Sequence, residues 1–219
     1  MSLFGLDLTQ FVIIIIAVLI AIDVHECCHA WVAAQMGDPT ARQMGRVSLN
    51  PIVHLDPLGT IMIFLTAIAG FGIGWGKPVP VDPYRLRYGP RVGMGIVSFA
   101  GPLANLTTAT LLAIPFRMGV AFLPPFLLEL LFIVSMVNIG LAVFNLLPLP
   151  PLDGYGVLQG ILASIRAPWA YRWAYTLARY EAYGPMILLL LIVANRFIPI
   201  FSLLIYPPYL LLRRLILGA

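Results

Sequence analysis

Charge is the property that this sequence lacks most. Only 10% of its 219 residues are charged, 61% are hydrophobic, and the mean hydropathy is +0.96. Soluble domains carry roughly a quarter charged residues, so the composition excludes an ordinary soluble domain and predicts an integral membrane protein. The net charge of +4 lies in short segments beside apolar runs, which indicates membrane orientation and not nucleic-acid binding.

Cysteine is almost absent too. Cys27 and Cys28 are adjacent, so no disulfide framework is expected, and we interpret both as small buried apolar residues. No small-residue cleavage site follows the first apolar run, which predicts a retained helix and not a secretory signal peptide. The sequence also lacks an internal repeat and any polar stretch large enough for a second domain. We therefore expect one membrane domain over residues 1–219.

Apolar segments are what the sequence has in abundance. A helix that crosses the hydrocarbon core needs about 20 mostly apolar residues, which predicts an all-α polytopic membrane protein with about 4–6 transmembrane segments. Two segments, 58–75 and 155–165, are short for a span. The last one is broken by prolines, which allows one span plus a surface helix, or a hairpin. The segments are 9–36, 58–75, 93–115, 125–147, 155–165 and 185–212.

The basic residues around segment 58–75 indicate how it lies. If this segment crossed the membrane, basic loops would face both compartments, against the positive-inside tendency. We therefore expect it to re-enter the bilayer, and an ordinary short span is the alternative. The N-terminus then lies outside and the end of the first helix faces the cytoplasm. The flanking basic residues are Arg42, Arg46, Lys77, Arg85, Arg87 and Arg91.

The sequence VHECCHA stands at the end of the first apolar run. Residues four apart lie on one face of a helix, so His25 and His29 can present two imidazoles to one metal ion. Glu26 lies beside that face, where it can take a proton from water that the metal activates. This is the His-Glu-x-x-His arrangement of zinc hydrolases. Each ionisable residue in a membrane helix costs about 2.5–3.5 kcal/mol, which favours a metal site over a merely structural polar patch.

Two histidines are too few for a catalytic zinc ion, which usually has three protein ligands and one open position. The leading candidates for the third are His54, in NPIVHLDPLG, and Asp153, in NLLPLPPLDGYG; Asp56 and Cys28 come behind them. Asp153 follows a proline-rich break, and non-helical backbone at membrane depth must be buried in protein or line a wet cavity. Taken alone, however, Asp153 fits a turn-forming Asp-Gly equally well.

Five stretches follow one another in this order: HECCHAWVAAQMGDPTA, GRVSLNPIVHLDPLGT, GKPVPVD, SFAGPLANL and VFNLLPLPPLDG. Together they resemble the site-2 protease family of intramembrane zinc metalloproteases (peptidase M50), specifically its short prokaryotic members without a PDZ or CBS domain. The resemblance covers residues 13–158. It implies one zinc ion per chain, with His25, His29 and Asp153 as ligands and Glu26 as the catalytic glutamate.

The resemblance also implies roles for residues around these four. Asn145 matches an asparagine that holds the substrate or the oxyanion, and is therefore expected to be catalytic. The extended segment that pairs with an unwound substrate falls within residues 70–82. Gly101 in GPLAN allows close helix approach. The supporting or substrate-binding residues are His54, Asn105, Lys77, Pro78 and Val79.

The resemblance further implies a fold and a setting. The fold is a three-helix catalytic core, 9–158, with a re-entrant or extended membrane-embedded segment, followed by C-terminal helices, 159–219. The expected activity is hydrolysis of peptide bonds within or near transmembrane segments of a membrane-protein substrate, such as an anti-sigma factor or a signal-peptide remnant. The expected location is the prokaryotic cytoplasmic membrane, with the active site toward the cytoplasm. The lipid bilayer is a partner, nucleic acid is not, and the oligomeric state stays open.

A membrane zinc or divalent-metal transporter is the alternative function, because such carriers can use a similar histidine helix as a transit site. A carrier needs a relay of polar residues across the membrane and often has repeated halves. Here the polar residues cluster toward one face and no repeat occurs, so we favour the protease. A catalytically silent scaffold is disfavoured because Glu26 is intact.

Overall fold

The computed structural model describes residues 8–69, 74–119, 123–195 and 197–218. These residues form helices and loops without a β-strand; a single antiparallel bridge joins Leu55 to Gly76. The all-α prediction is therefore confirmed. The α-helices are α1 (Leu8–Gln35), α2 (Thr40–Gln43), α3 (Pro57–Ala69), α4 (Pro90–Arg117), α5 (Pro125–Asn145), α6 (Asp153–Ser164), α7 (Pro168–Tyr180), α8 (Gly184–Ala194) and α9 (Ile200–Leu217), with 3-10 turns η1 (Pro51–Val53), η2 (Pro83–Arg85) and η3 (Glu181–Tyr183).

Five helical stretches among the described residues are long and apolar enough to cross a membrane. They are α1, α4, α5, the continuous stretch of α7 and α8, and α9. Their number agrees with the expected range, and the chain is an integral membrane protein. The expected boundary of the core at residue 158 falls inside α6, which runs on without a break.

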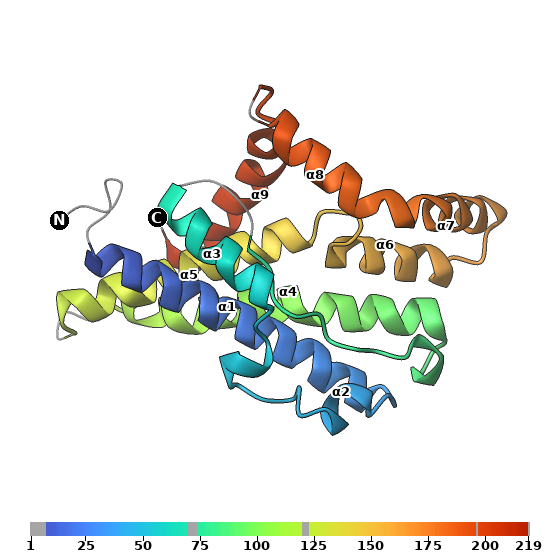
Figure 1. Ribbon diagram of the computed structural model, residues 1–219, viewed down its shortest axis with the longest axis horizontal. Helices are drawn as coiled ribbons and strands as arrows, with labels where there is room; N and C mark the ends of the chain where they lie inside the picture. The colour runs from blue at the N-terminus through green and yellow to red at the C-terminus, as the bar shows by residue number, and fades with distance from the viewer. Residues whose placement is uncertain (1–7, 70–73, 120–122, 196, 219) are drawn as a thin grey trace.

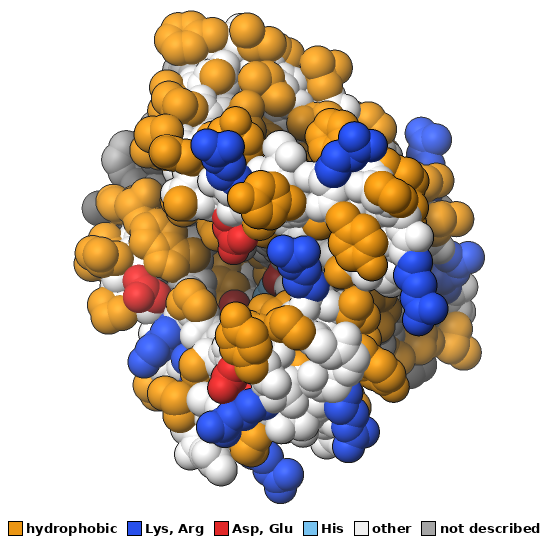
Figure 2. Space-filling view, turned by 90° about the vertical axis from the view of Figure 1, so that its right-hand side faces the viewer, with side chains coloured by type: hydrophobic (Ala, Val, Ile, Leu, Met, Phe, Trp, Pro, Cys, Tyr) orange, Lys and Arg blue, Asp and Glu red, His pale blue; other side chains and the backbone are white. Residues whose placement is uncertain are grey.

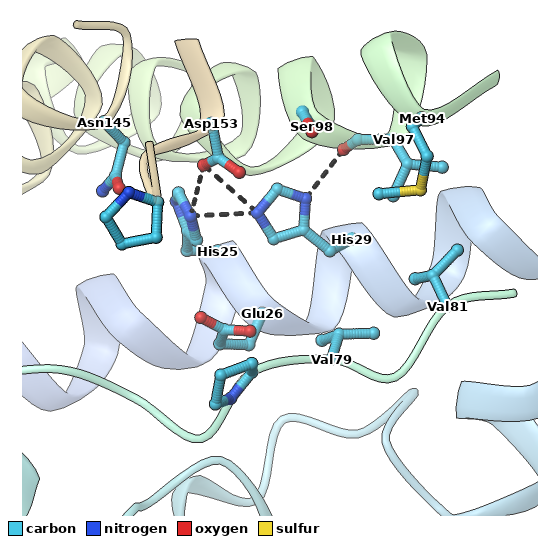
Figure 3. A pocket seen from close by; sticks show the side chains of 12 residues that line it. His25, Glu26, His29, Val79, Val81, Met94, Val97, Ser98, Asn145 and Asp153 are labelled. Carbon is cyan, nitrogen blue, oxygen red and sulfur yellow. Dashed lines mark hydrogen bonds and ion pairs between the residues drawn. The ribbon is translucent and has the colours of Figure 1, made fainter. Parts of the chain in front are cut away.

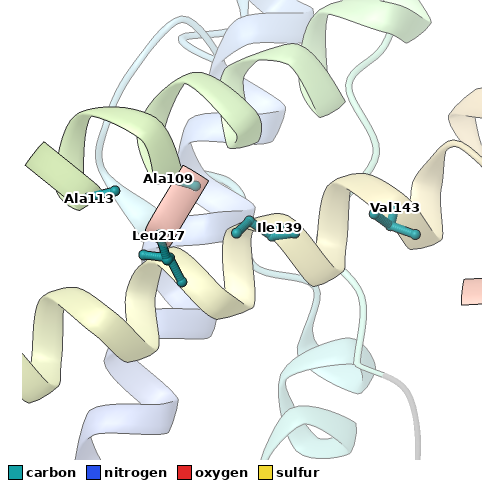
Figure 4. Close-up of a cluster of buried hydrophobic side chains, with 5 residues drawn as sticks. All are labelled: Ala109, Ala113, Ile139, Val143 and Leu217. Carbon is teal, nitrogen blue, oxygen red and sulfur yellow. The ribbon is translucent and has the colours of Figure 1, made fainter. Parts of the chain in front are cut away.

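Helix α4 is the centre of the bundle and lies beside α1, α5 and α6 (Figure 1). Small residues allow this close packing: a Cβ on Gly95 would lie 2.9 Å from the Cα of Gly160 on α6. The other half of α4 packs on α5 and on the end of α9 (Figure 4). The buried residues of that cluster are Ala109, Ala113, Ile139, Val143 and Leu217.

Helices α8 and α9 carry the chain from one end of the bundle to the other. Gly184, at the start of α8, packs against Pro150, close to the start of α6. Leu217, at the end of α9, packs in the opposite half, where α1 also begins (Figure 1). Arg117 donates hydrogen bonds to the carbonyls of Leu215 and Ile216 and so caps α9. The start of α8 and the end of α9 therefore lie at opposite ends of the bundle, whereas a hairpin would return to the end where it began.

Segment 58–75 leaves and returns to the same end of the bundle. Its two flanks meet: Leu55 bridges to Gly76, and the backbone N–H of Lys77 donates to the carbonyl of His54 at 2.7 Å. A true span would have separated these flanks by the thickness of the hydrocarbon core. The geometry is therefore that of the re-entrant segment that the charge distribution predicted, and not that of the alternative, an ordinary short span.

Helix α7 is a feature that hydropathy did not reveal, because its apolar residues are interrupted by arginines. Ala170 and Ala174 pack against Leu162 of α6, forming a narrow buried stripe. Arg172 and Arg179, seven residues apart, lie on the exposed side. Exposed aromatic residues flank the arginines, among them Trp169, Tyr171, Trp173 and Tyr175.

Candidate metal centre and cleft

His25 and His29 lie one turn apart on α1 and face the start of α6 (Figure 3). Their Nε2 atoms are 3.0 Å apart. Asp153 Oδ2 lies 2.9 Å from His25 Nε2 and 3.3 Å from His29 Nε2. Both histidines are buried and Asp153 is partly buried. Within the described ranges, these three side chains are the one set whose ligand atoms gather closely enough to hold a metal ion.

The second nitrogen of each imidazole has a fixed acceptor. His29 Nδ1 lies 2.7 Å from the carbonyl oxygen of Val97, and His25 Nδ1 lies 2.6 Å from Asn105 Oδ1. The orientation of the Asn105 amide follows from its Nδ2, which donates at 2.8 Å to the carbonyl of Ala21 and to Oδ1 of Asn138. Both Nδ1 atoms therefore carry a hydrogen, and in the neutral imidazole this leaves Nε2 as the atom with the lone pair.

This pattern leaves three acceptors facing one another. Each neutral imidazole directs the lone pair of its Nε2 inward, and Asp153 adds a carboxylate oxygen for which no hydrogen-bond donor is found in the described part of the chain. Lone pairs at such distances repel one another unless a cation lies between them. Two imidazoles and one carboxylate fit a zinc ion with a position open for water. The acceptor at each Nδ1 fixes the orientation of its imidazole.

Gly101 on α4 makes room for the two imidazoles. A Cβ at this position would lie 2.7 Å from His25 Cε1 and would overlap the His29 ring. The sequence suggested close helix approach for this glycine; its specific function is to admit the histidine pair.

The turn between α5 and α6 brings Asp153 to the histidines. Prolines at positions 148, 150 and 151 prevent α5 from continuing past Asn145. Gly154 lies directly against the carbonyl groups of Leu146 and Leu147, where no side chain would fit. The chain therefore reverses sharply, and α6 begins with Asp153 beside α1.

A pocket of about 220 Å³ lies beside the three ligand candidates. Glu26 and Asn145 line it, together with Pro78 and Val79 of the loop that follows α3. Figure 3 shows Glu26 on the opposite side of His25 from Asp153. Asn145 Nδ2 donates to the carbonyl of Leu141 at 3.0 Å, which leaves its second N–H hydrogen available.

The other candidates for the third ligand lie elsewhere. His54 is fully buried; its Nε2 lies 2.9 Å from the carbonyl of Ser48 and 3.5 Å from Asp23 Oδ1. Asp56 accepts a hydrogen bond from the backbone N–H of Gly59 and so begins α3. Neither of these residues, nor Cys28, joins the histidine pair in the part of the chain that the structure describes.

The expected substrate-pairing segment, 70–82, is described from residue 74 onward; residues 70–73 lie outside the described residues. From Lys77 to Asp82 the chain has no regular secondary structure and runs past Glu26 (Figure 3). We call residues 77–82 the extended segment. Lys77 contributes its backbone and has an exposed side chain, whereas Pro78 and Val79 line the pocket.

Asn138 and the carbonyl of Val97 are parts of the site that the sequence did not reveal. Asn138 is fully buried in the middle of the apolar α5 and donates to the carbonyl of Val134 at 2.8 Å. An asparagine in the middle of an apolar helix was the available signal, because such a residue needs a partner in a neighbouring helix. A backbone carbonyl leaves no signal in a sequence.

Basic residues gather at the end of the molecule where the pocket opens. Figure 2 shows this end: Lys and Arg side chains surround a central hollow in which acidic and histidine side chains are visible. The basic residues of this end are Arg42, Arg46, Lys77, Arg85, Arg87, Arg91, Arg166, Arg172 and Arg179. At the other end lie Arg117, Arg213 and Arg214. Arg213 and Arg214 were not considered when the basic residues were used to predict the topology. Basic residues are nevertheless still more numerous at the end where the pocket opens.

The ligand set joins two histidines of α1, a helix apolar enough to cross a membrane, to an aspartate at the start of α6, and with the adjacent glutamate it has the arrangement of a metal-dependent hydrolase in a membrane protein. The model of the family described as "Peptidase family M50" matches residues 121–188. "Putative zinc metalloprotease YwhC" of Bacillus subtilis is 39% identical over 202 residues, which are 89% of this chain and 84% of that protein. "Putative zinc metalloprotease Rip2" of Mycolicibacterium smegmatis is 32% identical over 161 residues, 68% of this chain and 57% of that protein. No solved structure matches.

The chain belongs to peptidase family M50, the site-2 protease family, as its motifs suggested. It is a zinc metalloprotease by class, and zinc is its cofactor. The transporter alternative finds no support in these relatives. Its physical basis is also weak, because the candidate ligands are gathered at one end of the bundle.

Proposed function

We propose that this chain is an intramembrane protease that hydrolyses peptide bonds within or near the transmembrane segments of other membrane proteins. One observation carries the proposal: a zinc-type ligand set and Glu26 open into a pocket that an extended, proline-containing segment borders. A cleft of this kind suits a peptide that has lost its helical structure.

In the proposed site, His25 and His29 bind zinc through Nε2 and Asp153 binds it through Oδ2. When bound, zinc supplies a Lewis acid that polarises the scissile carbonyl and makes water acidic enough to attack at neutral pH. Asn105 supports the metal site because its Oδ1 accepts a hydrogen bond from His25 Nδ1, which fixes the orientation of the His25 ring. His54 supports the site from a distance, by linking the loop at Ser48 to α1.

Glu26 is the proposed general base. Its carboxylate would take the proton of the attacking water and then deliver it to the nitrogen of the leaving amine. Asn145 would donate its second N–H hydrogen to the oxyanion that forms as the carbonyl is attacked. Neither residue is a metal ligand in this scheme, so each can be changed without removing the metal.

The substrate must be unwound before it can react, because a transmembrane helix hides its backbone in its own hydrogen bonds. The extended segment offers an alternative partner for that backbone. Pro78 and Val79 border the pocket beside Glu26, so main-chain pairing there would bring a scissile bond to the site with little sequence preference.

The charge asymmetry supports a cytoplasmic active site in a prokaryotic cytoplasmic membrane. Nine basic residues of the described chain lie at the end where the pocket opens, against three at the other end, which fits the positive-inside tendency. Trp169 and Trp173 on α7, near Arg172 and Arg179, fit the interface between lipid and water. The proposed substrates are single-pass proteins such as anti-sigma factors or signal-peptide remnants.

The test is co-expression with a panel of tagged single-pass membrane proteins, comparing the wild type with Glu26→Gln. Glu26→Gln should keep zinc and stop cleavage, because the ligands remain while the base is lost. Glu129→Gln is the matched control, since Glu129 is exposed near the start of α5, far from the pocket. Cleavage by Glu26→Gln at the wild-type rate would refute the assignment, and so would zinc flux without cleavage by the wild type in vesicles.

A further inference from the structure

The extended segment has one hydrogen-bonding edge. Along an extended chain successive N–H groups point to alternate sides, so those of Lys77, Val79 and Val81 share a side. Pro78 and Pro80 have no N–H to offer on the other side. The backbone groups of Val79 and Val81 form no hydrogen bond within the described residues. Beyond Lys77, whose own backbone groups are bonded, this edge is therefore available at Val79 and Val81, provided that the segment is held still.

Both ends of the extended segment are held by buried side-chain or backbone groups. At the first end, the N–H of Lys77 donates to the carbonyl of His54, and the Arg46 guanidinium donates to the carbonyl of Lys77. At the second end, the N–H of Asp82 donates to Asp38 Oδ2 at 2.7 Å.

Asp38 is fully buried between α1 and α2, and its hydrogen bonds explain how a carboxylate is tolerated there. Its Oδ1 accepts from the N–H and the hydroxyl of Thr40. Burial alone would raise the pKa of Asp38, but the hydrogen bonds from Thr40 and Asp82 and the charge of Arg85 lower it below the usual value. The carboxylate is thus a permanent acceptor for the backbone of Asp82.

Arg46 is a buried cation, 4% exposed, with few partners. Within the described chain its Nε has no hydrogen-bond partner, and no acidic side chain is close enough for an ion pair. Burial lowers the pKa of Arg46 and the negative charge of Glu26 opposes that shift, so the guanidinium also acts on the proposed base. Burying a charge in this way is costly, and a structural arginine would be expected to pair with a carboxylate. Among the described residues, the one hydrogen bond of its side chain is to the carbonyl of Lys77, on the segment that borders the pocket.

We infer that Arg46 and Asp38 are positioning residues: together they clamp the two ends of the extended segment, so that the free backbone edge at Val79 and Val81 is held beside Glu26 for a substrate strand. The role in substrate binding rests on the proposed function, whereas the hydrogen bonds that hold the two ends of the segment do not depend on it. It assigns a function to the polar residues of GDPTARQMGR, which the metal site leaves unexplained.

Hydrogen exchange of the full-length, zinc-loaded protein in detergent tests the clamp without any substrate. A peptide covering residues 74–83 contains three prolines and its first two residues do not keep their label, so it reports on few amides. Those of Lys77 and Asp82 are hydrogen-bonded. Asp38→Asn weakens the acceptor of the Asp82 N–H, and Arg46→Gln frees the carbonyl of Lys77 and so loosens that end of the segment. Each should speed exchange in this peptide by about 10-fold, with zinc content unchanged.

Two matched controls should exchange like the wild type. Thr40→Val removes a hydrogen bond to Asp38 but leaves the bond from Asp82. Arg42→Gln removes the same charge as Arg46→Gln from an exposed position on α2. Arg46→Lys keeps a donor and the charge, and should restore part of the protection.

Cleavage assays test whether the clamp contributes to substrate binding. With a substrate that the wild type cleaves, Asp38→Asn should raise KM more than it lowers kcat, because binding is weakened while the chemical groups stay. Arg46→Gln should raise KM too, but it also removes a positive charge that acts on Glu26, so its kcat should fall as well. Unchanged exchange in both variants would overturn the clamp. So would loss of zinc together with loss of protection throughout the chain in Arg46→Lys, which would make the arginine a general stabiliser. Failure of the wild type to cleave any substrate would instead refute the proposed function and leave the exchange result standing.

Discussion

Replacing Asn105 with leucine should weaken zinc binding by a measurable and bounded amount. In the wild type, Asn105 accepts from His25 Nδ1 at 2.6 Å and donates at 2.8 Å to Ala21 and to Asn138. Leucine has a similar volume but no polar atom, so all three hydrogen bonds are lost and the helices can stay packed. His25 then has no acceptor to fix its tautomer or its ring orientation.

The size of the loss in zinc affinity and in stability follows from the role of each lost hydrogen bond. Loss of an orienting partner behind a histidine ligand typically costs 10–100-fold in metal affinity, or about 1.4–2.7 kcal/mol. The protein should also unfold more easily, by about 1–3 kcal/mol, because Oδ1 of Asn138 is left buried without its donor. Since Glu26 and Asn145 are unchanged in this variant, excess zinc should recover most of the activity.

The assay is competition for zinc between the metal-free protein in detergent and a chromophoric chelator. Asn138→Leu is the matched control: it removes the Asn105–Asn138 bond but leaves Asn105 in contact with His25 and Ala21. Its zinc Kd should shift by less than about 10-fold, below the range expected for Asn105→Leu. A zinc Kd for Asn105→Leu that equals the wild-type value would refute the reasoning, as would a larger shift for Asn138→Leu.

Three other predictions concern ligands, space and topology. Asp153→Ala should lose both zinc and activity, whereas His54→Ala should retain much of its zinc; metal analysis of the purified variants decides, and the reverse result would make His54 the third ligand. Gly101→Ala should lose zinc because its methyl group would displace the two imidazoles, while Gly140→Ala should keep it, since the nearest atom to a Cβ there is 3.9 Å away. Single cysteines in the loop between α2 and η1 and in η2, in a background without the native cysteines, should be labelled from the same side by an impermeant thiol reagent. Labelling from opposite sides would make the 58–75 segment a true span and remove the basis for substrate pairing by the extended segment.

The ligand helix could be read from sequence because its spacing is a geometric constraint. His25 and His29 must face the same way on any α-helix, so their convergence needed no tertiary information. Asp153 was different: spacing and chemistry left it beside His54, Asp56 and Cys28, and the motif resemblance singled it out. The fold brings it to the histidines through a sharp turn at Gly154, which no local pattern could have located in space.

The return of segment 58–75 was predicted from the distribution of charge alone. Basic residues on both flanks indicated a common compartment, and the bridge between Leu55 and Gly76 brings those flanks together. Helix α7 escaped prediction for the converse reason. Its arginines lower the local hydropathy, and only packing of Ala170 and Ala174 on α6 gives it a partner.

The orienting groups behind the histidines were the least predictable part of the site. Asn105 belonged to a recognised motif, but its function depends on Asn138 of α5 and on the backbone of Ala21, which are distant in sequence. Such a network exists only once three helices are packed. A sequence can show that a polar residue lies in an apolar helix, but not which neighbour it will meet.

The two prolines of the extended segment also limit aggregation through its exposed backbone edge. An exposed backbone edge is a template for any extended chain, including the same segment of a second copy, and this is a route to aggregation. Pro78 and Pro80 remove the donors from one side of the strand, so it cannot sit in the middle of a growing sheet. One guest strand can be accepted, but a stack cannot be built on both sides. Replacing these prolines would therefore endanger solubility before it altered the chemistry.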